Sequence, residues 1–262
     1  MPARMASRSQ RAPAQLEAYV LHHYDWSESS LILDLYTREQ GRLAVAAKGA
    51  KRPHSQLRAV LLPFQRIHVS LGRTPAADNA PEVQTLRHAE WAGGQPMLSG
   101  AALFAGFYVN ELLLKLLARH DPHPALFDAY AVTLSALATS DETQAEAGLR
   151  AFELTLLRET GVLPDLSVVT LTQQPLGEGL SYTLRPDAGV IATSQDDASI
   201  AAAVLVQLQA ALEHGSVLAL QQACRAALAE LKTALRALLH YHLGSATLRT
   251  RQVMLDLQRL QH

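Results

Sequence analysis

The hydrophobic pattern of this chain changes its period near Pro96, and that change sets the class of fold. Before it, short runs alternate apolar and polar residues, as with Leu31, Leu33 and Leu35. After it, apolar residues recur every three or four positions over long stretches. A period of two indicates strands, and a period near 3.6 indicates helices. The sequence therefore predicts an α+β protein in which a β part is followed by an α part.

The first part contains five alternating runs separated by turn-forming residues. They cover residues 16–23, 30–37, 42–48, 64–71 and 82–89. Gly41, in the turn before the third run, can adopt a positive φ without a steric penalty. Five short strands in close succession, expected to pair antiparallel, are typical of a small closed barrel of the oligonucleotide-binding (OB) type. Residues 16–92 are therefore predicted to form an OB-fold domain, a five-stranded β-barrel.

Residues 1–15 contain Arg4, Arg8 and Arg11 and no acidic residue. We expect a disordered basic tail, because a terminal segment without an apolar pattern has little to pack. A transit peptide is the weaker alternative. No apolar run in the chain is long enough for a membrane-spanning helix, so a cytoplasmic protein without membrane contact is expected.

The second part, residues 96–262, is expected to be a helical C-terminal domain with a small β-hairpin insert. Helices are predicted over residues 98–119, 125–138, 143–160, 199–213, 217–243 and about 250–260. The third of them should end at Gly161, because glycine commonly follows the last helical turn. The hairpin is predicted over residues 180–192, with its turn at Pro186 to Gly189.

Charge is distributed unevenly along the chain although its net charge is only -1. Residues 1–80 carry a balance of +5, and the remainder carries −6. No carboxylate occurs between Glu39 and Asp78, a segment that holds Arg42, Lys48, Lys51, Arg52, Arg58, Arg66 and Arg73. A surface of one sign attracts a polyanion, because each neutralised phosphate releases condensed counterions. The segment therefore predicts nucleic-acid binding, with an ordinary solvated basic face as the alternative.

Candidate DNA-binding residues follow from where these cations fall on the predicted strands and turns. Four of them flank the turn at Gly49, and a fifth lies on the next strand; the candidates are Arg42, Lys48, Lys51, Arg52 and Arg66. Arg66 shares its strand face with Phe64 and His68. Aromatic groups beside cations suit a single strand, whose bases stack while its phosphates pair. The alternative places Phe64 in the core.

Residues that could carry catalysis or bind a metal do not gather in this sequence. Cys224 is the single cysteine, which excludes an intrachain disulfide and a cysteine-rich zinc site. His22 and His23 are adjacent, so on a strand their side chains should point to opposite faces. No phosphate-binding glycine loop, nucleophile elbow or paired-acid motif occurs. We expect no enzyme activity, no metal and no cofactor.

Several short stretches of the sequence carry a family resemblance when they are taken together in their order along the chain. They are Ala18-Tyr-Val-Leu-His, Trp26-Ser-Glu-Ser-Ser-Leu, Ala47-Lys-Gly-Ala-Lys-Arg, Leu62-Pro-Phe, Phe107-Tyr-Val-Asn-Glu-Leu-Leu and Arg150-Ala-Phe-Glu-Leu-Thr-Leu-Leu-Arg-Glu-Thr-Gly. Single stretches are weak signals, but their shared order and spacing make the set specific. From about Gln15 onward the chain resembles the RecO family of bacterial recombination mediators.

The resemblance implies a DNA repair and homologous recombination mediator rather than an enzyme. Such a protein binds single- and double-stranded DNA through its barrel and anneals complementary strands. It engages the single-stranded DNA-binding protein (SSB), and with RecR and RecF helps to load RecA. It would act in the bacterial cytoplasm, on the nucleoid when active. The alternative is a helical adaptor whose barrel binds protein partners and no nucleic acid.

The resemblance also carries roles to particular residues. Lys48, Lys51 and Arg52 fall in the family stretch implied to contact DNA. Arg150 and Phe152 fall in a segment linked to the acidic, aromatic-ended SSB tail, which a cation beside an apolar pocket would suit. Arg150 and Phe152 are two positions apart, and residues with that spacing on a helix do not share a face. Apolar stripes such as the one that contains Phe152 usually form the core. Some relatives hold zinc with four cysteines, which this chain lacks.

Overall fold

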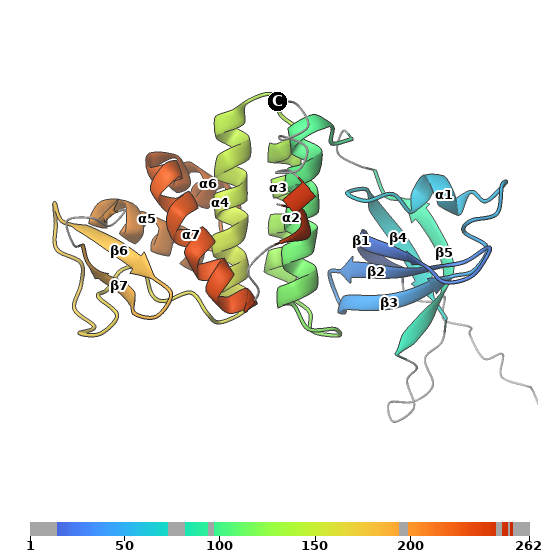
Figure 1. The fold of residues 1–262 in the computed structure, drawn as a ribbon, viewed down its shortest axis with the longest axis horizontal. Coiled ribbons are helices and arrows are strands. Elements are labelled where there is room, and N and C mark those ends of the chain that lie inside the picture. Colours follow the sequence, from blue (N-terminus) through green and yellow to red (C-terminus); the bar gives the residue numbers. More distant parts are fainter. Residues whose placement is uncertain are drawn as a thin grey trace, which may run out of the picture.

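The computed structural model describes residues 15–72, 82–93, 97–193, 199–244, 248–250 and 252–253. A β-barrel occupies one end of an elongated molecule, helices stand beside it, and a small sheet lies at the other end (Figure 1). The predicted α+β class, with a five-stranded barrel followed by a helical region that carries a small sheet, is confirmed. None of the helices in these ranges has the length and apolar character needed to cross a membrane.

Five strands close the barrel in the order β1-β2-β3-β5-β4. They are β1 (Gln15–Asp25), β2 (Leu31–Thr37), β3 (Gly41–Ala47), β4 (Arg66–Leu71) and β5 (Val83–Trp91). A short helix, α1 (Leu57–Val60), lies between β3 and β4. One pairing differs from the antiparallel arrangement predicted: β3 and β5 run parallel, with Ala44 opposite Val83. Most of residues 1–15, the predicted tail, lie outside the described residues, and Gln15 begins β1.

Both faces of β2 and of the first part of β1, up to Leu21, are buried, each against a different core. Alternate residues such as Val20 and Leu35 point into the barrel, whose buried side chains are Leu16, Ala18, Val20, Leu33, Leu35, Leu43, Val45, Ala47, Ala50, Leu61, Ile67, Val69, Leu86 and Ala89. The residues between them, Tyr19, Leu21 and Tyr36, belong instead to the core of the helical region. This double burial explains why the sequence Ala18 to Leu21 is apolar without interruption.

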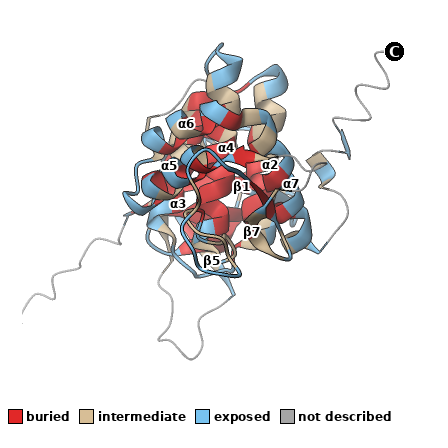
Figure 2. Ribbon diagram, turned by 90° about the vertical axis from the view of Figure 1, so that its left-hand side faces the viewer, coloured by how far each residue is buried: buried red, intermediate tan, exposed pale blue. Residues whose placement is uncertain are grey.

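The helical region packs around α4 (Glu142–Glu159), whose buried face occupies the middle of the molecule (Figure 2). The other helices are α2 (Gly100–Leu116), α3 (Pro124–Leu137), α5 (Ala202–Glu213), α6 (Val217–Cys224) and α7 (Leu228–Leu243). Asp141 caps α4 by accepting a hydrogen bond from the Gln144 amide at 3.1 Å. Gly161 follows it with φ +72°, as predicted for a helix end.

Two predicted helices are divided in the structure. The 217–243 stretch breaks into α6, a 3-10 turn at Arg225–Ala227 and α7, because Ala227 has a non-helical backbone with φ −153°. The break lets α6 pack on α5 and α4 while α7 packs on α4 and β6. The 199–213 stretch starts with a strand, β8 (Ile200–Ala201), before α5 begins. Most of the helix predicted over 250–260 lies outside the described residues.

The predicted hairpin is present and is extended by a third strand. It consists of β6 (Ser181–Arg185) and β7 (Gly189–Ala192), with Arg185 opposite Gly189. β8 pairs antiparallel with the other edge of β6, giving the order β7-β6-β8. The sheet packs against α7 and lies far from the barrel (Figure 1).

The barrel and the helical region meet at a tight junction, formed by the outer sides of β1, β2 and β3 against α2 and α3. The rings of Tyr19 and Phe127 lie 5.3 Å apart, and those of Tyr36 and Phe127 lie 5.4 Å apart. Burying each such side chain contributes about 1.5–3 kcal/mol. The Asn110 amide donates to the Leu21 carbonyl oxygen at 3.0 Å, so a buried polar contact also fixes the junction.

Candidate nucleic-acid interface

Three of the five predicted DNA-binding cations, Lys48, Lys51 and Arg52, lie in the segment directly after β3. Gly49 has φ +74°, and the turn that it permits brings Lys48 and Arg52 to the surface. Arg58, on α1, is also exposed. No ion pair to Lys48, Arg52 or Arg58 occurs among the residues that the structure describes. We call Lys48, Lys51, Arg52 and Arg58 the basic face.

Lys51 fastens this segment to the connection between β1 and β2. Its ammonium group lies 3.0 Å from the Asp25 carboxylate and donates to the Ser27 carbonyl oxygen at 3.1 Å. Its backbone amide donates to the Ser29 carbonyl oxygen at 3.0 Å. The Lys51 side chain remains about one third exposed, but one carboxylate already offsets part of its charge. Its contribution is therefore as much to position the loop as to attract an anion.

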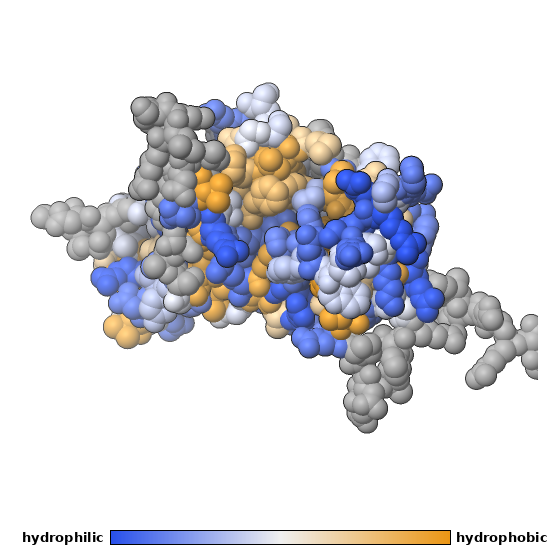
Figure 3. All heavy atoms as spheres, turned by 45° about the vertical axis from the view of Figure 1, so that its right-hand side comes forward, coloured by the Kyte–Doolittle hydropathy of each residue, from blue (hydrophilic) through white to orange (hydrophobic). Residues whose placement is uncertain are grey.

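A groove of about 370 Å³ runs between these two segments. Its floor is aliphatic and its rim is polar, and it is lined by His23, Asp25, Leu31, Ala50, Lys51, Leu57, Arg58, Leu61, Leu62 and Pro63. Hydrophilic side chains dominate the barrel surface that comes forward in Figure 3. An apolar floor can receive the flat face of a base while Lys51 and Arg58 at the rim contact phosphates.

Arg66 lies apart from the basic face, on β4 opposite Tyr19 of β1. Its guanidinium donates to the Glu17 carboxylate at 2.6 Å, and that hydrogen bond raises the pKa of Arg66. About 41% of the side chain is exposed. Because Glu17 neutralises the charge at contact distance, Arg66 is a weaker anion site than Lys48 or Arg52.

The prediction that Arg42 contacts DNA is not supported by its position. Arg42 is only 7% exposed, and its guanidinium forms two hydrogen bonds to the Asp34 carboxylate at 3.0 and 3.2 Å. The same group donates to the carbonyl oxygens of Leu114 and Leu117, each at 2.7 Å. Those carbonyls are at the C-terminal end of α2, where unpaired acceptors need donors. Arg42 is thus part of the junction.

Phe64 is in the core and is not available to stack on bases, as the alternative interpretation held. It is 5% exposed and precedes β4 with φ +66°, so it does not share a strand face with Arg66. Its ring lies 5.1 Å from that of Phe107, and a Cβ added at Gly106 of α2 would lie 2.9 Å from it. The side chain holds the helix against the barrel.

The segment proposed for the SSB tail is also buried. Phe152 is 0% exposed and Arg150 is 7% exposed. Arg150 lies 3.0 Å from Glu153, which accepts a hydrogen bond from the Tyr108 hydroxyl at 2.6 Å. Burial raises the pKa of the Glu153 carboxyl, although Arg150 and Tyr108 both act to lower that pKa. Neither Arg150 nor Phe152 offers a surface to a peptide in this structure.

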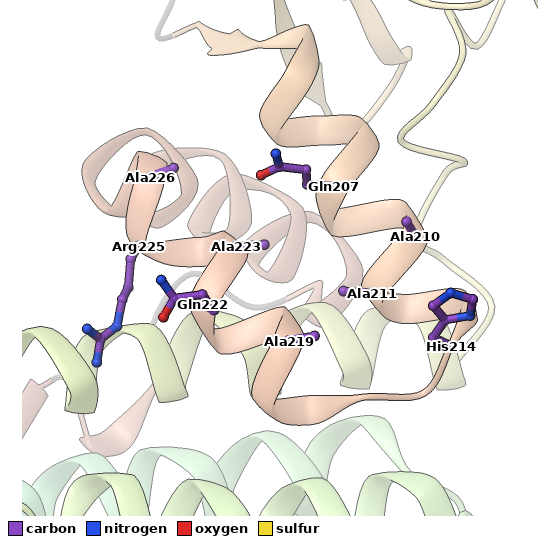
Figure 4. Close-up of a pocket in the computed structure, with 9 residues that line it drawn as sticks. All are labelled: Gln207, Ala210, Ala211, His214, Ala219, Gln222, Ala223, Arg225 and Ala226. Carbon is purple, nitrogen blue, oxygen red and sulfur yellow. The ribbon is translucent and has the colours of Figure 1, made fainter.

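A second groove, of about 700 Å³, lies between α5 and α6 and is lined largely by alanines (Figure 4). Gln207 points from α5 toward α6, Gln222 extends from α6 on the side of Arg225, and His214 lies at one end of the groove. Arg225 turns away toward α4, where it donates to Gln144. Among the described residues that line the groove, alanines form the floor and the one guanidinium, that of Arg225, points away.

Sequence reasoning missed the exposed aromatic residues at the end of β1. Tyr24 is 49% exposed and Trp26 is 57% exposed, beside the loop that Lys51 fastens. The available signal was the run of ring-bearing side chains from His22 to Trp26 in a polar stretch. A bulge between Val20 and His22 interrupts the β1–β2 register, and the ring centroids of His22 and His23 lie 6.0 Å apart. That the two side chains point to opposite faces stays a prediction.

Comparison with known proteins accounts for both parts of the chain. The model of the recombination protein O N terminus matches residues 12–92, and that of its C terminus matches residues 97–252. The DNA repair protein RecO of Polaromonas naphthalenivorans is 51% identical over 245 residues, which cover 93% of this chain and 96% of that protein. For the RecO proteins of Verminephrobacter eiseniae and Variovorax paradoxus, identity is 50% and 49% with the same coverage. The chain belongs to the RecO family of bacterial DNA repair and recombination proteins.

Proposed function

We propose that the barrel, residues 16–92, is the DNA-binding domain and that its basic face binds phosphates of single- and double-stranded DNA. The observation that carries this proposal is the exposure of Lys48, Arg52 and Arg58, with no ion pair to any of them among the described residues. A cation without a partner carboxylate has its full charge available to a phosphate. Phosphates are common to both forms of DNA, so binding depends little on sequence.

Annealing follows from the same electrostatics. Two complementary strands repel one another through their phosphates, and bound cations reduce that repulsion. A barrel that holds phosphates leaves the base edges of most nucleotides free to pair. The protein needs no covalent step for this role, and we propose that it acts as a mediator and catalyses no reaction.

The remainder of the chain has a negative charge balance, which does not favour DNA, and an acidic peptide there would need a local cation. We propose that the helical region engages the SSB tail, and that the protein acts with RecR and RecF to help load RecA on the nucleoid. Family membership supports these partners. Arg150 and Phe152 are buried, and the described residues that line the α5–α6 groove direct no cation into it, so the tail binds another part of the helical region.

The test is the double variant Lys48→Ala with Arg52→Ala, measured by fluorescence anisotropy with a labelled single strand at several salt concentrations. We expect affinity to fall about tenfold and the slope of log K against log salt to drop by about 1.4, because two phosphate contacts are lost. A matched control, Arg185→Ala with Lys232→Ala, removes the same charge from exposed positions of the helical region. The control should bind as the parent does.

Two results would reject the proposal in different ways. Unchanged affinity and salt slope in the barrel double variant would show that DNA binds elsewhere. Failure of the parent protein to shift either single- or double-stranded DNA in an electrophoretic assay at low salt would favour the adaptor alternative. In that case the barrel would bind a protein partner.

A further inference from the structure

We propose that Tyr24 and Trp26, here called the aromatic tip, form a stacking site for unpaired bases and give this protein a preference for single strands over duplex. The inference rests on the proposed DNA binding by the barrel. It names the part of the nucleic acid that the aromatic tip recognises, which is the exposed face of a base.

The exposure of these two side chains is the first observation. Trp26, which directly follows β1, is 57% exposed. Tyr24, near the end of β1, is 49% exposed. The ring of His22 meets that of Tyr24 edge-on at 4.5 Å, so three rings lie close together in the chain and two of them touch. Exposed rings of this kind can accept the face of a nucleotide base, because every base presents a π-surface.

The second observation is that the aromatic tip is held in place beside the basic face. The amides of Trp26 and Ser27 both donate to the Ser30 carbonyl oxygen, at 3.3 and 3.4 Å. Lys51 bonds to Asp25 and Ser27, the two residues that flank Trp26 in the chain. The indole is therefore carried on a closed turn, and ordering it on a ligand costs little conformational entropy.

Charge sets the orientation of the bound strand. Asp25 and Glu28, on the same connection as the aromatic tip, are exposed and disfavour a phosphate there. Lys48, Arg52 and Arg58 lie on the neighbouring segment and attract phosphates. Bases are thus directed toward Tyr24 and Trp26, and the sugar-phosphate backbone toward the basic face. A duplex keeps its bases stacked and paired inside, so it cannot use this site.

Intrinsic fluorescence gives a direct test, because the chain contains only two tryptophans, Trp26 and Trp91. Trp91→Phe leaves Trp26 as the only indole in the full-length protein. Stacking of a base on Trp26 should quench its emission when oligothymidylate is added, and a duplex of the same length should leave it unchanged. The reciprocal variant Trp26→Phe, with Trp91 as the reporter, should show no such quenching.

Affinity gives the second readout. Trp26→Ala should weaken oligothymidylate binding about tenfold and leave duplex binding within about twofold, because one stacking contact is lost. Trp26→Phe should restore most of the affinity by keeping a ring. Trp91→Ala is the matched control: Trp91 is 62% exposed but lies on β5 opposite Ile67, which pairs with the first half of β1. It should bind as the parent does.

The outcomes separate this inference from the proposal beneath it. Two results would overturn the stacking site and leave DNA binding intact. One is tight binding of oligothymidylate, measured by anisotropy, without quenching of Trp26. The other is an equal loss of duplex and single-strand affinity in Trp26→Ala. If neither DNA form binds the parent protein, the proposed function fails and the stacking site fails with it. Quenching restricted to single strands, with loss in Trp26→Ala only, would support both.

Discussion

Lys48 and Arg52 lie exposed on the barrel, with no ion pair among the described residues, whereas Arg42 on the same acid-free stretch is buried. Arg42 bonds to Asp34 and to two carbonyl oxygens at the end of α2. Side chains with the same charge thus occupy two different regions, a solvent-facing surface and a sealed junction. What separates them is the presence of a carboxylate across the β2–β3 hairpin.

A local surplus of basic residues in the sequence therefore does not reveal which of those residues can bind an anion. Arg150 makes the same point in the helical region, where Glu153 and burial remove it from solvent. A buried cation with a partner fixes structure, and its loss is a loss of stability. An exposed cation without one affects stability little and binding strongly.

The largest expected effect separates the two regions directly. Arg42→Ala leaves the Asp34 carboxylate, which is 2% exposed, without its main partner. Breaking a buried pair costs about 3–5 kcal/mol, and we expect about 3 kcal/mol in urea unfolding because Arg119 lies 3.6 Å from Asp34 and compensates in part.

Arg52→Ala is the matched control and should change the free energy of unfolding by less than about 0.5 kcal/mol while weakening DNA binding. The structural role of Arg42 would be contradicted if Arg42→Ala unfolded at the same urea concentration as the parent protein but bound DNA more weakly. That result would return Arg42 to the binding surface.

A backbone change in the junction should have the next largest effect. Gly41 has φ +67°, and a Cβ there would lie 2.1 Å from the Asp121 carbonyl oxygen. Gly93 has φ +84° with nothing within 4 Å of the equivalent position. Gly93→Ala should cost about 1 kcal/mol from backbone strain alone. Gly41→Ala should cost at least about 1 kcal/mol more in chemical denaturation, and equal losses would show that the close approach to Asp121 is easily relieved.

The smallest effect concerns the buried pair in the helical region and depends on pH. Burial raises the pKa of Glu153 above its ordinary value, so the folded protein holds that proton over a range in which the unfolded chain has lost it. Across that range the free energy of unfolding falls as pH rises, by at most about 1.4 kcal/mol per pH unit.

Glu153→Gln keeps an acceptor for the Tyr108 hydroxyl and removes the titration. Urea unfolding of both proteins at a series of pH values isolates the contribution of this carboxyl. Above the ordinary glutamate pKa, the difference in the free energy of unfolding between variant and parent should grow with pH. A constant difference would mean that Glu153 is ionised in the folded state throughout.

Much of the fold could be predicted because the alternation of apolar residues is a local signal. Leu33 and Leu35 were placed on one face by their spacing, and both are buried in the barrel. The parallel pairing of β3 with β5 was not predictable in this way, because it depends on closure between strands far apart in sequence. The break at Ala227 has no glycine or proline to mark it, and packing of α6 and α7 decides it.

The site was predicted less well, since exposure depends on partners that distant segments supply. For Arg42 part of the signal was present: in the β2–β3 hairpin, Asp34 pairs with Ala44 and Tyr36 with Arg42, so the two charges are diagonal neighbours. For Phe64 no local signal existed, because α2 covers it. Lys48 and Arg52 remain as predicted candidates at the surface.

The ring contacts between Tyr19, Tyr36 and Phe127 have a consequence for how such a chain can change over generations. Strand residues and helix residues complete the same apolar interior, although separate family models match the two parts. A barrel taken from a distant relative would bring side chains of other sizes to this seam and leave gaps or overlaps. The two parts can therefore be exchanged between species only together, or with matched substitutions on both sides of the contact.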